Sequence, residues 1–462
     1  MTWLPYDIWS ERIDTARTIK HYGKVTQVVG LVVESAGPAV SIGRLCRIEN
    51  YDNGARVLAE VVGFRDDRIL LMPLGPITGI TPGAIVTSTF EQLRIPVGSQ
   101  LIGRVVGGLG EPIDDKGPIT SSVNRWINAQ PIAALRRRRI TEPIHTGIRV
   151  IDTMAMVGKG QRMGIFSGSG VGKSVALGMI ARGSSADVNV VALVGERGRE
   201  VREFIERDLG PEGMRNSVVV AVTSDQPALI RVKGAMVATT IAEYFRDQGK
   251  DVMLMMDSLT RIAMAQREIG IAVGEPPTTK GYTPSVFSLM PQLLERAGQS
   301  DRGSITGLYT VLVEGDDFNE PVSDAVRSIL DGHVALSRRL AARNQYPAVD
   351  VLDSISRLMK DIATEEEITL AGQVRRLMSI YRENEDVINI GAYNRGSSPA
   401  IDMAIEKLEP LNEFFGQGIN ERADHGESIR RLAEILNGSE NGNDQPEDMK
   451  DEEVSIPAAG PS

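Results

Sequence analysis

A glycine-rich segment between an apolar run and a helical pattern constrains the fold of this chain more than any other feature. It reads Gly164-Ile-Phe-Ser-Gly-Ser-Gly-Val-Gly-Lys-Ser174, and residues 175–182 continue with helical spacing. This order predicts a strand, a tight loop and a helix, in which loop N–H groups and the positive helix N-terminus bind phosphate. We expect Lys173 to reach the β- and γ-phosphates and the Ser174 hydroxyl to ligate Mg²⁺.

One position departs from the phosphate-loop pattern, because Ser167 stands where that pattern has a glycine. Gly168 and Gly170 lie close enough to supply the lost backbone freedom. Taken alone, the segment could also be an ordinary glycine-rich loop, and the rest of the chain makes that the weaker interpretation. The residues expected to contact the nucleotide here are Gly168, Ser169, Gly170, Val171, Gly172, Lys173, Ser174 and Val175.

Size and composition indicate a multidomain globular protein of a reducing compartment. The chain has 462 residues, enough for about three domains. Its apolar content of 42% and charged content of 24% are ordinary for a soluble protein. A single cysteine, Cys46, excludes an intramolecular disulfide. The sequence shows neither a secretory signal nor an uncharged apolar run long enough for a bilayer, so we expect a cytoplasmic protein.

Charge is unevenly distributed along the chain. Residues 439–462 hold seven acidic residues and one lysine, and so account for −6 of the net charge of −10. The remaining body is nearly balanced, which argues against a dedicated nucleic-acid binder. We expect the acidic tail to be disordered.

The N-terminal quarter of the chain divides into a helix and a β domain. Residues 1–24 predict an amphipathic helix, and Trp3 and Trp9 on it would suit docking to a partner as well as packing on the protein's own body. Residues 25–97 alternate short β-branched runs with turn residues, which predicts a small closed β domain. The expected strands are 25–33, 39–42, 59–64, 69–72 and 84–89.

A connector over residues 98–150 leads into an α/β domain over residues 151–346. Near-continuous apolar strands separated by helical stretches predict a parallel sheet covered by helices on both faces. From 347 to 438 the pattern is mostly helical, which predicts a helical C-terminal domain. The strands expected in the α/β domain are 162–167, 189–195, 217–223, 251–257 and 305–313.

Two carboxylates follow apolar strands of this domain. Asp257 ends one such strand, and a carboxylate at a strand tip beside a phosphate loop can support Mg²⁺ through water. Glu196 ends another, where it could orient a water for attack on the γ-phosphate, although a helix-capping role is the alternative. The sequence thus places two acidic candidates at the phosphate-binding edge of the predicted sheet.

Five motifs occur in one order along the chain and are far more specific together than singly. On these motifs the sequence resembles the catalytic-subunit family of rotary F/V-type ATPases, over about residues 25–438. Within that family it is most similar to the type III protein-export ATPases, and specifically to the flagellar ones. The motifs are residues 167–174, Gly195-Glu-Arg-Gly-Arg-Glu200, Met256-Asp-Ser-Leu-Thr-Arg261, Pro276-Pro-Thr-Thr-Lys-Gly-Tyr282 and Tyr346-Pro-Ala-Val-Asp-Val-Leu-Asp-Ser-Ile-Ser-Arg357.

The resemblance implies a fold and a set of roles. The fold is an N-terminal six-stranded β barrel, a RecA-like phosphate-loop domain and a helical C-terminal domain, which agrees with the three parts read from the residues. The activity is hydrolysis of Mg·ATP, with Glu196 and Lys173 as catalytic residues. Arg357 matches the arginine finger that enters the neighbouring subunit's site. The remaining implied roles are metal binding by Ser174 and, through water, Asp257, contact with the phosphates by Arg197 and Arg261, and stacking on adenine by Tyr346.

The resemblance also implies partners and a location. A finger supplied in trans requires an oligomer, and the family implies a homohexameric ring around a central stalk protein. Its N-terminal helix binds a stator-like regulatory dimer, and its C-terminal face meets export chaperones, export substrates and a membrane export gate. The protein would therefore be cytoplasmic and recruited peripherally to the inner face of the cytoplasmic membrane, without a nucleic-acid partner.

Four alternatives remain open on the sequence alone. They are an injectisome secretion ATPase, the catalytic subunit of a rotary ATP synthase, a hexameric RNA translocase with a related core, and a non-catalytic nucleotide-binding subunit. Glu196 and Arg357 in one chain favour a homomeric ring over a synthase. The carboxylate of Glu196 argues against a non-catalytic subunit, and the balanced charge argues against the translocase.

Overall fold

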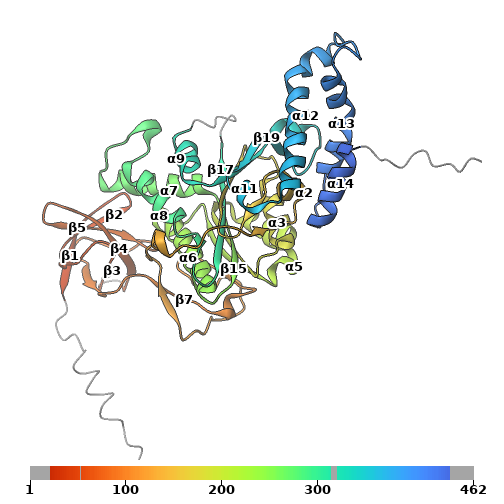
Figure 1. The fold of residues 1–462 in the computed structure, drawn as a ribbon. Coiled ribbons are helices and arrows are strands. Elements are labelled where there is room, and N and C mark those ends of the chain that lie inside the picture. The colour runs from red at the N-terminus through yellow and green to blue at the C-terminus, as the bar shows by residue number, and fades with distance from the viewer. Residues whose placement is uncertain (1–20, 52–53, 314–319, 438–462) are drawn as a thin grey trace, which may run out of the picture.

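The computed structural model describes residues 21–437, except for 52–53 and 314–319. The predicted N-terminal helix with Trp3 and Trp9, and the acidic tail from residue 439, lie outside the described residues. The described chain passes through a β barrel, a sheet-centred α/β part and a group of C-terminal helices (Figure 1). Within the described ranges, no helix combines the length and the apolar character that a membrane crossing needs.

Six antiparallel strands close the N-terminal barrel in the order β1-β2-β5-β4-β3-β6. Their inward residues, among them Val33, Cys46 and Ile48, form a separate apolar core. The predicted small closed β domain is therefore confirmed. The strands are β1 (Tyr22–Val29), β2 (Val32–Ala36), β3 (Leu45–Glu49), β4 (Arg56–Arg65), β5 (Arg68–Pro73) and β6 (Ile85–Ser88).

The barrel corrects two of its predicted strands. The run predicted at 25–33 is a hairpin, because Gly30 adopts φ 57° and reverses the chain between β1 and β2. The strand predicted at 39–42 is wrong, because these residues form a loop that turns at Gly43. Val40 packs against the barrel core and Ile42 is exposed, so their apolar character reflects coverage of the barrel rather than a strand. Strand β3, which follows the loop, was not predicted.

A nine-stranded sheet forms the centre of the molecule, in the order β19-β18-β12-β17-β15-β13-β14-β8 with β16 paired to β17. The neighbours along this path are parallel, except that β19 runs antiparallel to β18. Its strands are β8 (Val105–Val106), β12 (Arg162–Ser167), β13 (Val188–Glu196), β14 (Ser217–Thr223), β15 (Asp251–Asp257), β16 (Gly298–Gln299), β17 (Ser304–Leu312), β18 (Gly332–Leu336) and β19 (Val349–Ser356).

All five strands predicted for the α/β part are present, as β12, β13, β14, β15 and β17. The sheet is wider than predicted, because the connector supplies β8 at one edge and β19 forms the other edge. β19 lies in the region after Pro347 that was predicted to be mostly helical. Its sequence mixes valines with aspartates and serines, as an edge strand with one exposed side allows, and so lacks the apolar run of the central strands.

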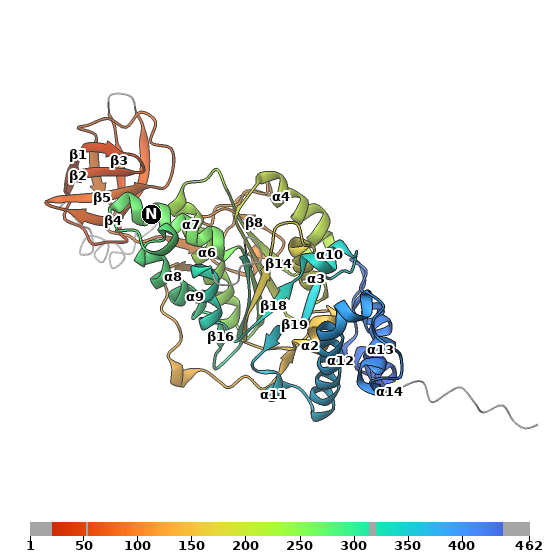
Figure 2. The same ribbon diagram turned by 90° about the horizontal axis from the view of Figure 1, so that it is seen from above.

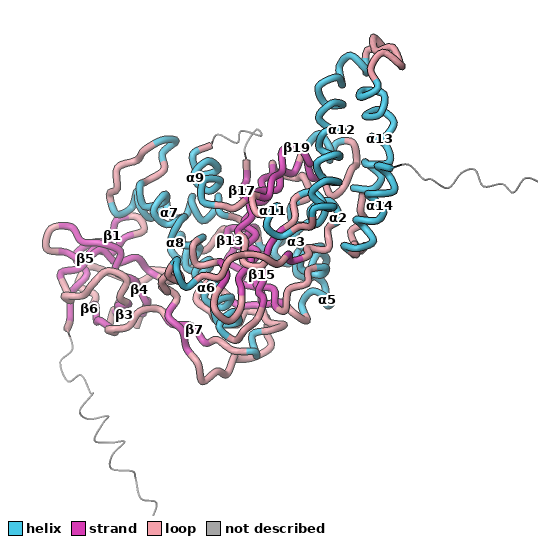
Figure 3. Tube along the Cα trace, viewed as in Figure 1, coloured by secondary structure: helices cyan, strands magenta, loops and turns pink. Residues whose placement is uncertain are grey.

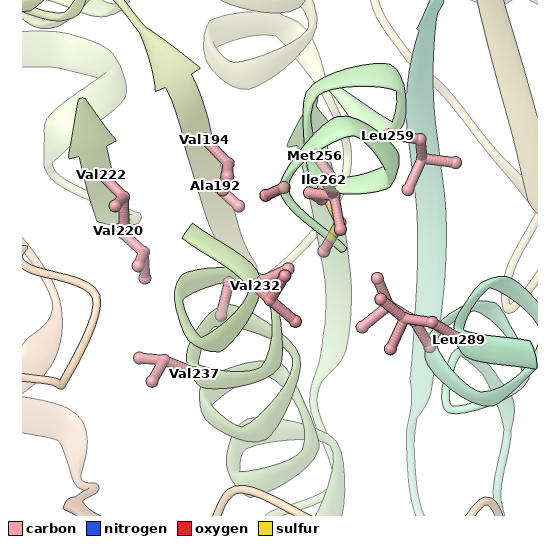
Figure 4. Packing of buried hydrophobic residues seen from close by; sticks show 14 of the residues in the cluster. Ala192, Val194, Val220, Val222, Val232, Val237, Met256, Leu259, Ile262 and Leu289 are labelled. Carbon is pink, nitrogen blue, oxygen red and sulfur yellow. The ribbon is translucent and has the colours of Figure 1, made fainter. Parts of the chain in front are cut away.

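Helices cover both faces of the sheet, as predicted (Figure 2). Successive strand residues point to opposite faces, so Ala192 and Val194 of β13 face α6 and α7 (Figure 4). Leu193 belongs to the apolar cluster on the other face, together with Leu177 and Ile180 of α3. The helices are α2 (Arg149–Met154), α3 (Lys173–Gly183), α4 (Gly198–Glu203), α5 (Gly210–Met214), α6 (Ala228–Asp247), α7 (Leu259–Val273), α8 (Pro284–Leu294), α9 (Pro321–Ile329), α10 (Arg338–Ala342) and α11 (Met359–Ile362).

Short elements complete the connections. A π-helical turn joins α4 to α5. Two small strand pairs lie beside the main sheet, β7 with β9 and β10 with β11. Their bounds are β7 (Arg94–Pro96), β9 (Asn124–Trp126), β10 (Pro143–Ile144) and β11 (Val157–Gly158), and the 3-10 turns are η1 (Ser99–Leu101), η2 (Ala134–Arg136) and η4 (Thr279–Gly281), with the π-helical turn at η3 (Phe204–Leu209).

Three helices form the C-terminal part, α12 (Glu365–Asn389), α13 (Pro399–Phe415) and α14 (His425–Asn437) (Figure 3). α12 starts at a capping box, in which Thr364 accepts from the N–H of Glu367 and the Glu367 carboxylate accepts from the N–H of Thr364. The apolar faces of the three helices pack together through Val374, Phe414 and Leu432. The helical C-terminal part is therefore confirmed.

Candidate active site

The glycine-rich loop connects the end of β12 to the first turn of α3. Gly170 and Gly172 adopt φ 79° and 95°, a left-handed conformation that glycine takes without steric cost. Gly168, which was expected to supply the same freedom, is not among the positive-φ glycines. Lys173 is the first residue of α3, so the loop amides and the helix N-terminus face the same space.

Two carboxylates from neighbouring parallel strands meet at this loop. Glu196 is the last residue of β13 and Asp257 is the last residue of β15, and both side chains are buried. The Lys173 ammonium lies 3.6 Å from Glu196 Oε1 and donates a hydrogen bond to Asp257 Oδ1. Thr310 donates to the same Asp257 oxygen at 2.8 Å. The predicted association of loop lysine and strand-end carboxylates is therefore seen in the structure.

Arg261 from α7 completes this charged cluster. Its Nε donates to Glu196 Oε1 at 3.1 Å, and its Nη2 donates to Glu196 Oε2 at 3.2 Å. A Cβ atom at Gly195 would lie 2.9 Å from the Arg261 side chain, and Gly195 also has a φ of 76°, so this position requires glycine. The arginine thus fixes the orientation of the Glu196 carboxylate from both of its oxygens.

The surroundings of Glu196 keep its carboxyl group close to the point of ionisation at neutral pH. Burial raises the pKa of Glu196 to about 7, and a hydrogen bond with Glu200 and the charge of Asp257 act in the same direction. Lys173 and Arg261 oppose this shift. The pKa of Glu200 is lowered, first by its hydrogen bond with Glu196. Glu200 has no predicted role, although it belongs to the Gly195–Glu200 motif that also contains Glu196.

Two of the expected nucleotide contacts differ in how close they lie to this cluster. The Tyr346 ring lies against the loop, since a Cβ atom at Gly172 would be 3.5 Å from Tyr346 Cε1, and 41% of the tyrosine is exposed. That leaves an aromatic surface open beside the phosphate loop. The Arg197 side chain is 75% exposed and lies 3.6 Å from Glu200, so the structure does not bring it to Lys173.

Arg357 lies at the opposite end of the sheet strands from the phosphate loop. The end of β12 at Ser167 pairs with Leu336, and Leu336 pairs in turn with Val349, the first residue of β19. β19 runs back along β18 only as far as Ser356, which pairs with Gly332, and the N–H of Arg357 donates to the carbonyl of Asp331. The N–H of Asp331 donates in turn to the carbonyl of Arg162, so Arg357 lies level with the start of β12, about 17 Å from Ser167 at about 3.3 Å per residue. This distance exceeds the reach of an arginine side chain, so Arg357 cannot contact the loop of its own chain.

The residues at the loop fit a bound Mg²⁺ ion. Ser174 follows Lys173, and Lys173 contacts Asp257, so a hydroxyl and a carboxylate lie at the same strand edge. Oxygen ligands of these kinds are the ones that Mg²⁺ prefers. The buried hydroxyls of Ser167 and Ser258, at the ends of the same strands, have no hydrogen-bond partner within the described part of the chain. The site therefore has unused polar groups for phosphate or water.

Comparisons with known families match each of the three parts. Residues 25–89 match the model of the ATP synthase alpha/beta family, beta-barrel domain. Residues 147–356 match the nucleotide-binding domain of the same family. Residues 363–434 match the T3SS EscN ATPase C-terminal domain.

Individual proteins and solved structures are similar over most of the chain. The flagellum-specific ATP synthase of Bacillus subtilis (strain 168) is 54% identical over 435 residues, covering 93% of this chain and 98% of that protein. The type 3 secretion system ATPase of Xanthomonas euvesicatoria is 48% identical, covering 90% and 94%. The structure of the assembled ATPase EscN from enteropathogenic E. coli is 43% identical, with a TM-score of 0.85, and covers 90% of this chain and 100% of that one.

Proposed function

The chain belongs to the ATP synthase alpha/beta family, among the flagellum-specific ATP synthases and type 3 secretion system ATPases, and we propose that it hydrolyses ATP for flagellar type III protein export. It is a P-loop ATPase with the three-part fold of that family. The flagellum-specific ATP synthases of Bacillus subtilis and Treponema pallidum, at 54% and 50% identity, support the flagellar assignment, while the Xanthomonas secretion ATPase and the Salmonella typhimurium flagellar protein are both 48% identical.

The charged cluster at the phosphate loop supports the chemistry. Lys173 would leave Asp257 to bind the β- and γ-phosphates, together with the loop amides. The ionised Glu196, held by Arg261, would orient a water and accept its proton as the water attacks the γ-phosphorus. Mg²⁺ bound by Ser174, and through water by Asp257, would supply the positive charge that offsets the phosphates. Tyr346 would provide the surface on which the adenine stacks.

The observation that carries the proposal is the separation of Arg357 from its own phosphate loop. A residue at the opposite end of the sheet strands can act as an arginine finger only on the site of another copy. The active site would therefore be shared between adjacent subunits of a homohexameric ring. The assembled form of EscN, and its complex with the central stalk EscO, support a ring around a stalk for this chain as well.

The remaining partners are proposed from the family. They are a stator-like dimer at the N-terminal helix and export chaperones, substrates and a membrane export gate at the C-terminal face. They would place the ring in the cytoplasm at the inner face of the membrane. A synthase is the weaker alternative, because each copy carries both Glu196 and Arg357 and can form a ring from one kind of chain.

A complementation experiment tests the shared site. Glu196→Gln removes the group that orients water but keeps the finger, and Arg357→Ala removes the finger but keeps the site. We expect each variant alone to lose ATPase activity, by roughly 10³-fold or more for the finger. In mixed rings, the finger of one variant meets the intact site of the other, so activity should return.

The matched control is a mixture of Glu196→Gln with the double variant Glu196→Gln/Arg357→Ala, which contains no intact site and should stay inactive. Ring formation is followed by size-exclusion chromatography with light scattering. Mixed rings that assemble and remain inactive would rule out a finger acting in trans. Full activity of Arg357→Ala alone would do the same.

A further inference from the structure

One segment connects the nucleotide site of a chain to the finger that the same chain would give to its neighbour. Tyr346 lies beside the phosphate loop, β19 begins three residues later, and Arg357 follows its last residue. β19 therefore runs from the end of the sheet that holds the phosphate loop to the opposite end. Any element that holds β19 also determines where Arg357 lies.

Helix α12 lies beside this strand (Figures 1 and 2) and contacts it through two arginines. Arg375 Nη1 donates to the backbone carbonyls of Val351 at 2.8 Å and Ser354 at 3.0 Å, in the bulge between Asp350 and Ile355 where β19 has no pairing register with β18. A side chain of the C-terminal helices thus bonds backbone groups in the part of β19 that strand pairing leaves out.

Arg382 forms the second attachment, two helical turns further along α12. It forms an ion pair with Asp350 and another with Asp353, in which Nη1 lies 3.1 Å from Oδ1. Asp350 is buried, and its carboxylate also accepts from the N–H groups of Leu352 and Asp353 at 3.0 and 3.2 Å. Because these amides lie in β19 itself, the carboxylate transmits the position of Arg382 directly to the strand backbone.

Charged contacts rather than apolar packing join this half of α12 to the sheet. The last buried apolar residue of α12 is Leu377, and the next residue, Met378, packs partly buried against the same apolar cluster. Beyond it, a cavity of about 560 Å³ separates α12 and α13 from α10 and the start of β19. Across this cavity Glu385 accepts from Arg339 and Arg343 at 2.9 Å each, and Arg343 lies three residues before Tyr346. Movement of α12 would therefore be transmitted mainly through these ion pairs.

We propose that Arg382 is a positioning residue for the arginine finger. By linking α12 to Asp350 and Asp353, it fixes the position of β19, and β19 in turn fixes the position of Arg357 in the site of the next subunit. The C-terminal helices, which the proposed export partners would contact, thereby control hydrolysis one subunit away. This inference rests on the proposed function, because it assumes that Arg357 acts in trans.

The complementation pair allows the effect to be assigned to one subunit. Arg382→Gln is added either to the Glu196→Gln chain, which donates the finger, or to the Arg357→Ala chain, which contributes the working site. We expect the first placement to lower the restored kcat by roughly ten- to a hundredfold, since a displacement of about 1 Å can cost that much. The second placement should leave the restored kcat nearly unchanged, and KM for ATP should stay the same in both.

Matched variants separate positioning from folding. Arg376→Gln changes an exposed arginine of the same helix and should have no effect in either placement. Arg382→Lys, which keeps one charge but not the fork to two aspartates, should recover part of the activity. Asp350→Asn keeps an oxygen for the two backbone amides but loses the charge, and should repeat the donor-only loss. If Arg382→Gln prevents ring assembly, the Asp350→Asn variant provides the test of positioning instead.

The outcomes distinguish the two proposals. Equal losses in both placements would show a general structural role for Arg382 and overturn its role as a positioning residue, as would no loss in either. Failure of the proposed function would instead appear as absence of complementation in the pair that retains Arg382. A loss of kcat only when Arg382→Gln is in the chain that donates the finger, with unchanged KM, supports the positioning role of Arg382.

Discussion

Glu196, the proposed general base, lies in surroundings that resist its ionisation. Its carboxyl group is buried and hydrogen-bonded to Glu200, while Lys173 and Arg261 supply positive charge beside it. The balance leaves its pKa at about 7. A general base is most effective when its pKa lies near the working pH, so this balance suits proton transfer from water near neutral pH.

The pH dependence of the reaction follows from this pKa. Because the pKa is raised, Glu196 is neutral below about pH 7 and cannot accept a proton, so kcat/KM should fall with decreasing pH from about that value. Steady-state ATPase rates between pH 5.5 and pH 8.5 give the profile. Glu200→Ala removes a group that raises the pKa, and should move the acid limb to lower pH. An acid limb that does not move in the Glu200→Ala variant, or an acid limb near the ordinary pKa of a glutamate, would contradict the assignment of Glu196 as the base.

At the scale of elements, a buried ion pair joins the barrel to the α/β part. Lys233 of α6 and Glu60 of β4 are both buried, and Lys233 Nζ lies 2.7 Å from Glu60 Oε1. The second oxygen of Glu60 has no hydrogen-bond partner within the described residues. The carboxylate therefore depends on Lys233 for its compensation.

Breaking this pair should destabilise the protein more than breaking an exposed one. Lys233→Met leaves the Glu60 charge buried and unpaired, which should lower the free energy of unfolding by about 3–5 kcal/mol. Lys233→Met/Glu60→Gln should recover a large part of the loss. The control is Lys250→Met, where the lysine side chain is 51% exposed and lies 3.8 Å from Asp187, with an expected change of about 0–1 kcal/mol. Urea denaturation followed by circular dichroism measures all three, and equal effects of the two single changes would contradict this account.

Elements with a continuous apolar pattern were predictable from the sequence, and elements defined by tertiary contacts were not. β12, β14 and β15 were predicted with their observed bounds, because buried parallel strands are apolar throughout. The two strand-end carboxylates followed from them. β19 was missed because its aspartates pair with Arg382 of α12 and the hydroxyls of Ser354 and Ser356 accept hydrogen bonds from Ala335 and Gln161, so the strand lacks a continuous apolar run.

The candidate site shows the same division. The convergence of Lys173, Glu196 and Asp257 could be inferred from strand ends and the phosphate-loop motif. The role of Arg357 came only from the family resemblance, because no local pattern distinguishes a finger from a surface arginine. The position of Arg357 on the sheet and the attachment of β19 to α12 could not be predicted. Both depend on pairings between residues far apart in the sequence, which a single sequence does not reveal.

At the scale of the whole molecule, the two ends of the sheet strands carry different functional groups that one chain cannot bring together. The phosphate loop lies at one end, and Arg357 follows β19 at the other end. In a closed ring, each interface joins one end of each kind. If Arg357 acts on the neighbouring site as proposed, a single copy would hold a nucleotide site without its finger, and would bind ATP without hydrolysing it efficiently.

Specific ATPase activity should consequently depend on protein concentration. On dilution, rings lose subunits and each loss removes a finger from a site, so activity per mole of chain should fall steeply, while binding of a fluorescent ATP analogue should decline much less. Arg357→Ala should be nearly inactive at every concentration and bind the analogue as well as the unmodified protein. Chemically cross-linked rings supply the control, because they keep their interfaces on dilution and should keep their activity. Activity that is independent of concentration in the uncross-linked protein would show that each chain holds a self-sufficient site, and would leave Arg357 without a catalytic role.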